Sequence, residues 1–526
     1  MDRRHFLRSS MMATIGGMAV RGFSSPLLKG LRNDVADERV LVVVQLIGGN
    51  DGLNTVIPLD QYGALAALRN NVLIPQSAVL PLTGLDATGF HPAMTGMREL
   101  WENGKLGIVQ GVSYPDPNFS HFRATDIWET GADAGQLLSS GWTGRYLNFE
   151  YPNYPAGYPN DDMPDPLAIR IGGPIGPALQ YMGMSMGTAI NNTNDPLNLS
   201  GNIYLDPVSA VCHGGKLDLV RQVQRQTDLY GDVIEAAAQD GCNMSSLYPT
   251  GNAPGAQLAQ ALKIVAQLIC GGLKTKIYWV SIGGFDTHAQ QVDPDDHTIG
   301  THANLLKGVS DSIHAFQDDL SLLGLEERVL GMTFSEFGRR IVDNASVGTD
   351  HGSALPMFFF GTKVIPGMTG TNPQIPPNST VQTNLAMQFD FRSVYASILK
   401  DWFCVEEDDM DAILLNTYQP LQIIDPDGCL GTGVHAINQA AGMELLHAWP
   451  NPFTERFTLG YTSQGGRLLI QVFDEQGRTV STVLDQPMAS GTYTVDVDLG
   501  PMPSGIYYVR LQNEGLQQVR NVLKVR

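Results

Sequence analysis

The stretch Val40–Gly52 reads VLVVVQLIGGNDG, and its pattern recurs further along the chain. Its first eight residues are almost all apolar and mostly β-branched, which predicts a strand buried on both faces. The glycines and Asn50 that follow predict a tight turn, which places Asp51 at the carboxyl end of the strand. Asp51 is therefore a candidate site residue; the alternative is a solvated turn carboxylate.

Other apolar runs also lead into residues that can bind a metal. Lys276–Ile282 precedes GGFDTH, with Asp286 and His288. Val329–Phe334 precedes SEFGRR, with Glu336 and Arg339, and a loop then runs to GTDHG, with Asp350 and His351, before Leu355–Phe360. His297 and His302 lie in a polar stretch and are expected to be solvated.

Strands alternate with helices through this region, which predicts an α/β fold with a doubly wound, mostly parallel sheet covered on both faces. The loops that follow the strands of such a sheet share one edge. Carboxylates and imidazoles brought together there would need cations. The sequence therefore predicts a divalent metal, zinc or manganese, with magnesium or calcium as alternatives, held by Asp51, Asp286, His288, Glu336, Asp350 and His351.

A second candidate element is the segment SHFRATDIWETG, Ser120–Gly131, whose pattern predicts a helix from His121 to Thr130. Ser120 falls at the N-cap, where the positive end of the helix dipole favours an alkoxide or a bound anion. The alternative is that Ser120 only caps the helix. Arg123 and Arg339 could bind the outer oxygens of an anion bidentately, or each could be structural.

Composition bounds the function. The 526 residues suit two or three domains. A net charge of −20 argues against binding to nucleic acid or anionic lipid. No apolar stretch is long enough for a transmembrane segment.

The five cysteines contain no Cys-x-x-Cys, which excludes a zinc ribbon. Cys404–Cys429 and Cys212–Cys242 are plausible disulfides by proximity, and Cys270 is expected to be a buried thiol.

The N-terminus reads MDRRHFLR and continues into a weakly apolar run, Met11–Val20. Paired arginines before a short apolar region resemble a twin-arginine export signal, over residues 1–30. An ordinary basic terminus is the alternative. The resemblance implies the twin-arginine translocase as a partner and export to the periplasm.

The quoted motifs, together with DFRSVYASIL at Asp390–Leu399, resemble those of the bacterial family called domain of unknown function 1501. The resemblance covers roughly Val40 to Phe403. It implies an alkaline phosphatase-like and sulfatase-like α/β domain, over residues 38–405, with a two-metal site. By position, Asp51 matches a first metal carboxylate, Ser120 a nucleophile, and His351 a last metal histidine.

The chain departs from that pattern at one position. Phe337 stands where phosphatases place a metal histidine, so that Asp350 or His121 would have to substitute. The chain also lacks the Cys/Ser-x-Pro-x-Arg context of formylglycine sulfatases. The resemblance implies a secreted hydrolase of small anionic phosphate or sulfate esters, with Ser120 and His121 catalytic. A surface protein that binds without turnover is the alternative.

The composition and residue pattern of the sequence change near its end. Residues 406–443 form an acidic, turn-rich linker. Residues 444–526 contain short alternating strands, which predict a small β-sandwich. The opening Pro-Asn-Pro-Phe and the Ser-Gly-Ile-Tyr-Tyr motif resemble the type A sorting domain of the type IX secretion system. This implies that machinery as a partner and a secreted or surface-attached product; an adhesive or carbohydrate-binding sandwich is the alternative.

Overall fold

The computed structural model describes residues 39–191, 214–426, 429, 444–449, 453–474, 478–513 and 516–524. The chain divides into two compact units, one within Asp34–Cys429 and one within Leu430–Arg526. The predicted export signal, Cys212, the Pro-Asn-Pro part of the sorting motif and residues 430–443 of the predicted linker lie outside the described residues.

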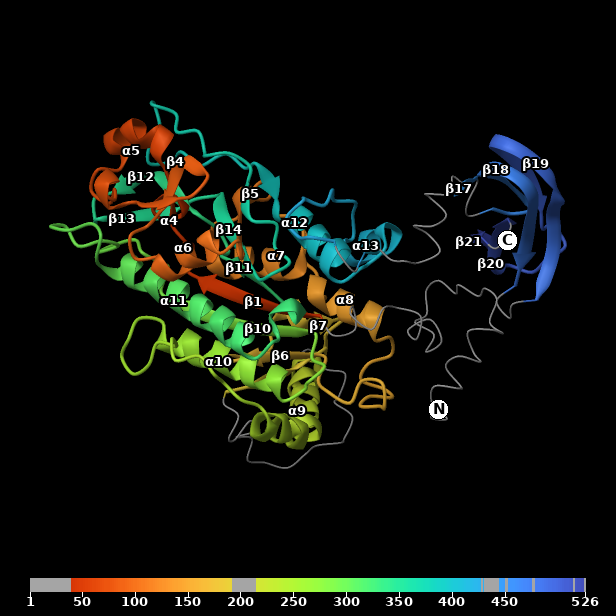
Figure 1. Ribbon diagram of the computed structural model, residues 1–526, viewed down its shortest axis with the longest axis horizontal. Helices are drawn as coiled ribbons and strands as arrows, with labels where there is room; N and C mark the ends of the chain where they lie inside the picture. Colours follow the sequence, from red (N-terminus) through yellow and green to blue (C-terminus); the bar gives the residue numbers. More distant parts are fainter. Residues whose placement is uncertain are drawn as a thin grey trace. The chain divides into compact units, whose positions relative to one another are not determined.

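A nine-stranded sheet forms the centre of the larger unit (Figure 1). β1 (Val40–Ile47) lies between β10 (Ile277–Gly283) and β11 (Val329–Phe334) and is parallel to both. The sheet continues on the β10 side through two further parallel strands, β6 (Ala168–Ile171) and β9 (Thr188–Ile190). The predicted buried strand at Val40–Ile47 is thus confirmed as a central strand.

Among the described residues, the other half of the sheet contains the one strand that runs antiparallel to its neighbours. β14 (Leu355–Phe360) runs antiparallel to β11 and to β5 (Leu106–Ser113). β15 (Gly367–Thr369) and β16 (Phe389–Asp390) pair with β5 in parallel. The sheet is therefore mostly parallel, and the predicted fold class is confirmed.

Alternate residues of β1 enter two separate cores, which is the signature of a sheet covered on both faces. Val40, Val42 and Val44 pack in one core, to which α6 (Thr95–Glu102), α9 (Gly214–Asp240), α10 (Ala256–Cys270) and α11 (Thr301–Leu322) contribute. Leu41 and Val43 pack in the other, with α7 (His121–Thr130), α8 (Trp142–Glu150) and α12 (Phe391–Ser397). Each such buried side chain stabilises the fold by about 1.5–3 kcal/mol.

Short elements complete this unit. They are α4 (Gly52–Thr55), β2 (Val56–Pro58), α5 (Tyr62–Leu68), β3 (Leu80–Leu82), β4 (Leu85–Phe90), β7 (Gln180–Tyr181), β8 (Met184–Ser185), β12 (Arg339–Asn344), β13 (Gly348–His351) and α13 (Glu407–Leu414), with a π-helical turn at Ile398–Trp402. β12 and β13 form an antiparallel hairpin. The expected loop between the Ser335 and Gly348 motifs is therefore largely regular structure, which fixes the position of His351.

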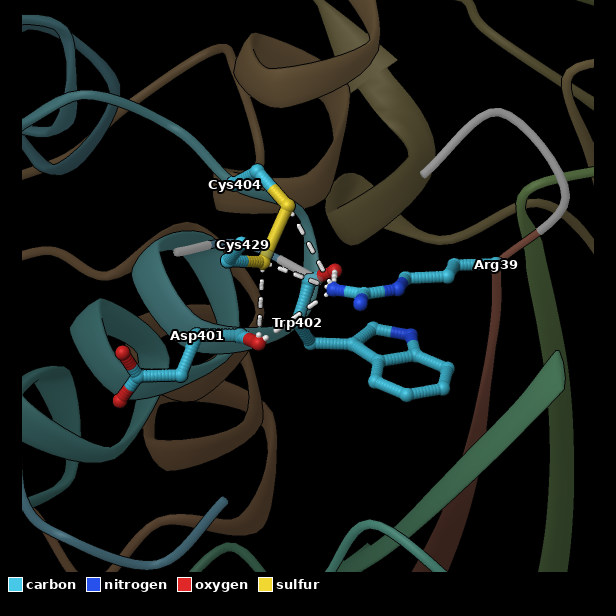
Figure 2. The surroundings of a disulfide bond; sticks show 5 residues. All are labelled: Arg39, Asp401, Trp402, Cys404 and Cys429. Carbon is cyan, nitrogen blue, oxygen red and sulfur yellow. Dashed lines mark hydrogen bonds between the residues drawn. A yellow bond between two sulfur atoms is a disulfide. The ribbon is translucent and has the colours of Figure 1, made fainter. Parts of the chain in front are cut away.

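The predicted disulfide between Cys404 and Cys429 is confirmed (Figure 2). One guanidinium nitrogen of Arg39, the residue just before β1, lies 2.7 Å from the sulfur of Cys429 and 2.6 Å from the backbone oxygen of Trp402. The Arg39 guanidinium also lies 5.0 Å from the centre of the Trp402 ring. These contacts join the start of β1 to the end of the unit. The prediction for Cys270 was wrong, because this thiol is partly exposed.

The smaller unit is an antiparallel all-β structure. Its strands are β17 (Glu444–Trp449), β18 (Arg456–Phe473), β19 (Thr479–Asp498), β20 (Gly505–Asn513) and β21 (Leu516–Lys524). Hydrogen bonds join them in one sheet, in which β17 and β20 pair with different halves of β18. β18 is 18 residues long, where the sequence predicted short strands. Gly465 and Gly466, both with positive φ, let it continue through the middle.

No helix in the described part of the chain is long and apolar enough to cross a membrane.

Candidate metal centre

Three histidines and one carboxylate converge at the edge of the large sheet. Asp286 and His288 follow β10, His351 ends β13, and His121 begins α7. The Nε2 atoms of His351 and His288 lie 3.0 and 3.2 Å from Oδ1 of Asp286. The Nε2 atom of His121 lies 3.3 Å from Oδ2 of the same carboxylate. Three segments that are distant in sequence therefore supply one cluster.

Each histidine has a partner for its other ring nitrogen. His121 Nδ1 lies 2.8 Å from Glu336 Oε1, and His288 Nδ1 lies 3.0 Å from Asp350 Oδ1. His351 Nδ1 lies 2.9 Å from the backbone oxygen of Phe119. Because these oxygens only accept hydrogen bonds, each Nδ1 carries the proton and donates it. Each Nε2 then presents a lone pair toward Asp286, the arrangement that metal-binding histidines adopt.

The donor set fits a divalent cation. His288 Nε2 lies only 2.9 Å from His351 Nε2, so two lone pairs face each other beside a carboxylate. A positive charge between them would remove this repulsion. Zinc or manganese bonds to nitrogen and oxygen are about 2.0–2.2 Å long, so neighbouring ligands of one ion stand about 3 Å apart. The measured separations match. The ligand atoms of His121, Asp286 and His351 all lie within 4.8 Å of one another.

Asp286 is held in its ionised form. Burial would raise the pKa of Asp286, but the hydrogen bond from Arg339 and the positive charge of its guanidinium outweigh that effect and lower the pKa to about 2. Burial also lowers the pKa of His351, which favours the neutral, ligating imidazole. The side chains of Asp286 and His288 are 47% and 44% exposed, so solvent and small molecules can reach the cluster.

Arg339, predicted to bind substrate, occupies a buried position behind the cluster. Its guanidinium donates to Oδ1 of Asp286 at 2.8 Å and to four backbone oxygens. Those oxygens belong to the strand-end loops and the hairpin: Gly48, Gly49, Phe285 and Thr349. Through these contacts, Arg339 joins the loops after β1 and β10 to the β12–β13 hairpin.

Asp51 is also buried, but it does not join the three histidines. It pairs with the buried Arg69 and accepts a 2.6 Å hydrogen bond from Gln291. Burial would raise the pKa of Asp51, and the positive charges of Arg69 and His302 more than offset this, so the pKa is lowered. No sequence pattern identifies Arg69 or Gln291 as partners of Asp51, since both reach it from other segments.

His302 differs from its prediction. It was expected to be solvated, and it is fully buried in α11, with Nε2 3.0 Å from the side-chain oxygen of Asn50. A second buried histidine, His91, lies beside it, with ring centres 6.1 Å apart. Helical periodicity places His302 one turn before Leu306 on the buried face of α11, a signal that the polar residues before it obscured.

Glu336 and Asp350, both predicted ligands, lie behind histidines. Glu336 is fully buried and accepts from the backbone N–H of Gly48 at 2.8 Å as well as from His121. Asp350 accepts from the side-chain amide of Asn344 at 3.0 Å as well as from His288. In this structure both carboxylates orient histidines of the cluster.

Phe337 forms an apolar wall of the cluster. It is buried, and its ring centre lies 4.4 Å from that of His351 and 5.0 Å from that of His121. Gly49 packs against the ring so closely that a Cβ there would collide with it. The departure from the phosphatase pattern at this position thus supplies packing in place of a ligand.

Ser120 and Arg123 lie close to His121 in the sequence, at the start of α7. Ser120 is the exposed N-cap residue, and its hydroxyl does not cap the helix. The hydroxyl therefore remains available beside His121. Arg123 pairs with Asp126 and donates to the backbone oxygen of Ala134 at 3.1 Å. These contacts hold the segment after α7, a structural use of Arg123.

Comparison with known families confirms both resemblances drawn from the motifs. Residues 216–412 match the family described as protein of unknown function (DUF1501), and residues 447–525 match the secretion system C-terminal sorting domain. The sorting domain implies interaction with the type IX secretion machinery and supports secretion to the cell surface or exterior. A search of curated proteins found no significant match.

Several solved structures show distant likeness. One is PorZ of Porphyromonas gingivalis, a surface component of the type-IX secretion system, at 15% identity and a TM-score of 0.13 over 18% of this chain. The chain spans only 13% of the length of PorZ. A Bacteroides thetaiotaomicron protein of a glycosaminoglycan-metabolising locus matches at 9% identity and a TM-score of 0.33, over 92% of this chain and 88% of the other.

Alkaline phosphatase from the Antarctic bacterium TAB5 matches at 9% identity and a TM-score of 0.24, over 62% of this chain and 91% of the other. These likenesses assign no activity to the chain.

Proposed function

We propose that the protein is a secreted, metal-dependent hydrolase of small phosphate or sulfate esters. The convergence of three histidine Nε2 atoms on Asp286, each with its other nitrogen tied to an oxygen, is the observation that supports the proposal. His121, His288, His351 and Asp286 would hold one divalent cation, zinc or manganese in the first place, with magnesium or calcium as alternatives. When bound there, the cation supplies Lewis-acid polarisation of an ester oxygen.

Ser120 is the proposed nucleophile. Its exposed hydroxyl stands at the N-terminus of α7, where the helix dipole favours developing negative charge. Ser120 Oγ would attack the phosphorus or sulfur of the ester, and the alcohol would leave. Water would then hydrolyse the covalent serine ester. His121, the next residue, would help the cluster to orient the reacting ester. Glu336 would hold the His121 ring in place.

To contact the anion, Arg123 and Arg339 would have to exchange their present hydrogen-bond partners for the substrate. Each now donates to backbone oxygens and a carboxylate. The backbone N–H groups at the start of α7 are the more accessible donors for an anionic group.

A second function has a specific observation in its favour. A two-metal site needs further ligands, yet Asp51 is paired with Arg69, and Phe337 occupies the position of a metal histidine. These features suit a surface protein that binds a metal, or a metal-bound anion, without turnover.

The two functions are separated by one set of measurements. Purified full-length protein is assayed by elemental analysis and with aryl phosphate, phosphodiester and sulfate esters, with added zinc, manganese, magnesium or calcium. Bound metal with turnover that is lost in Ser120→Ala supports the hydrolase. Bound metal without turnover supports the binding protein. Absence of bound metal in the presence of each added ion would overturn both.

We also propose that the chain reaches the periplasm through the twin-arginine translocase before the type IX machinery handles it. The Arg3–Arg4 pair and the apolar run that follows support this step.

A further inference from the structure

Two cysteines away from the metal centre lie within reach of a covalent bond. Cys242 comes two residues after α9, and Cys270 is the last residue of α10. Their sulfur atoms are 2.9 Å apart. Non-bonded heavy atoms in contact rest about 3.5–4.0 Å apart, and a disulfide bond is about 2.05 Å long. The two sulfurs therefore need to move by less than about 1 Å to bond.

The backbone around the two cysteines fixes this distance. Gly241 precedes Cys242, and a Cβ on it would collide with the backbone oxygen of Gln267. Gly271 follows Cys270, and a Cβ on it would collide with the backbone oxygen of Ala237. The Gln267 side chain also donates to the backbone oxygen of Ala238 at 2.7 Å. The ends of α9 and α10 are thus in direct backbone contact.

The segment after Cys242 is anchored to a third helix. Asp319, buried on α11, accepts hydrogen bonds from the side chain of Asn243 at 2.8 Å and from the backbone N–H groups of Met244 and Ser245 at 2.6 and 3.0 Å. Asn243 also donates to the backbone oxygen of Lys263 in α10 at 3.0 Å. Cys242 is therefore held beside Cys270 on both of its sides.

We propose that Cys242 and Cys270 form a second disulfide in the exported protein. The Cys404–Cys429 disulfide and the sorting-domain match both point to an oxidising compartment. The exposed Cys242 is the thiol that an oxidant can reach.

The oxidant is a protein disulfide. The Cys242 thiolate attacks one of its sulfurs to give a mixed disulfide and release one oxidant thiolate. The Cys270 thiolate then attacks Cys242 Sγ and releases the second. Two thiols of this chain are oxidised while one disulfide of the oxidant is reduced.

This pairing differs from the sequence-based pairing of Cys242 with Cys212. With five cysteines in the chain, two disulfides that use Cys404, Cys429, Cys242 and Cys270 would leave Cys212 as the single thiol. The new bond would cross-link the ends of α9 and α10 and so restrict the unfolded chain.

The test uses the full chain, refolded with glutathione disulfide or produced in an oxidising compartment. Free thiols are counted in denaturant, and non-reducing peptide mapping identifies the cross-links. We expect one thiol in the wild-type chain, two in each of C242S and C270S, and none in C212S. The map should contain a peptide pair joining Cys242 to Cys270.

Three thiols in the folded wild-type chain, or a cross-linked peptide containing Cys212, would overturn the proposal. The single-serine variants are checked for folding by circular dichroism. If either fails to fold, the wild-type and C212S counts and the peptide map still decide the pairing.

Discussion

His288 Nε2 lies 2.9 Å from His351 Nε2, although the two residues stand on different elements and 63 positions apart in the sequence. Neither nitrogen carries a proton, because Nδ1 of each ring donates to an oxygen. The pair is therefore a site of unfavourable contact that a bound cation would convert into a favourable one. This relationship makes metal affinity the most direct property to measure.

Removing the charge behind His288 should weaken metal binding. In Asp350→Asn the side-chain oxygen can still accept from His288 Nδ1, but the imidazole loses its carboxylate partner. We expect metal affinity to fall about 10- to 100-fold, measured by competition with a chelating dye. The control is Asp343→Asn on the same hairpin, whose carboxylate accepts from the backbone of Asn71. Unchanged affinity in Asp350→Asn alongside lost binding in His351→Ala would contradict the prediction.

Removing Arg339 should destabilise the larger unit. The variant Arg339→Ala leaves four backbone oxygens and Asp286 without their donor. Each buried backbone oxygen left without a donor costs about 1–3 kcal/mol. Urea unfolding followed by tryptophan fluorescence measures the change.

The matched control for this variant is Lys307→Ala, which removes an exposed ion pair with Asp311 and should change stability by less than about 0.5 kcal/mol. Arg339→Lys should recover little, since an ammonium group cannot reach all these oxygens. Equal stabilities for Arg339→Ala and Lys307→Ala would rule out the joining role of Arg339.

The stability of the larger unit should fall below neutral pH because of His302. Burial is the main cause that lowers the pKa of His302 from 6.5 to about 4. The unfolded chain then binds a proton on His302 between these values while the folded chain does not. The contribution of His302 to the free energy of unfolding is fully present above pH 6.5. It declines as the pH drops toward 4, by on the order of 3 kcal/mol.

This decline is measured as the urea midpoint from pH 7 to pH 4.5 on chelator-treated protein, so that metal release does not contribute. His302→Gln removes the titrating group, and the decline in this variant should be smaller than in the wild-type chain. His91, whose pKa burial lowers to about 3, accounts for part of the slope that remains. An identical slope in both proteins would refute the assignment to His302.

The two ends of the chain should act at different membranes. Deleting residues 447–525, which match the sorting domain, should leave the protein in the periplasm. Replacing Arg3 and Arg4 together by lysine should leave it in the cytoplasm, because twin-arginine recognition requires the arginine pair. Cell fractionation followed by immunoblotting measures both. Surface delivery of the lysine variant at the wild-type level would contradict the role of the arginine pair.

Local pattern was enough to predict much of this protein. The β-branched run Val40–Ile47 specifies a strand that is buried on both faces, and it is the central strand. The position of Asp286 and His288 directly after a predicted strand placed them at the edge where parallel strands bring their carboxyl ends together. His351 reaches the same edge because it precedes β14, which runs antiparallel to β11. The Cys404–Cys429 pair was also recognisable from proximity in the sequence.

Only the tertiary structure decided which of these residues meet. Asp51, Glu336 and Asp350 have the same chemistry as Asp286, yet Asp51 is neutralised by Arg69, and the other two orient histidines. Sequence records which groups can bind a metal, but their partners arrive from loops up to hundreds of residues away. Phe337 and Arg339 pack against those loops and so fix the distances between the side chains of the cluster. A difference of about 3 Å decides whether a side chain can contact a metal itself or instead positions a histidine that can.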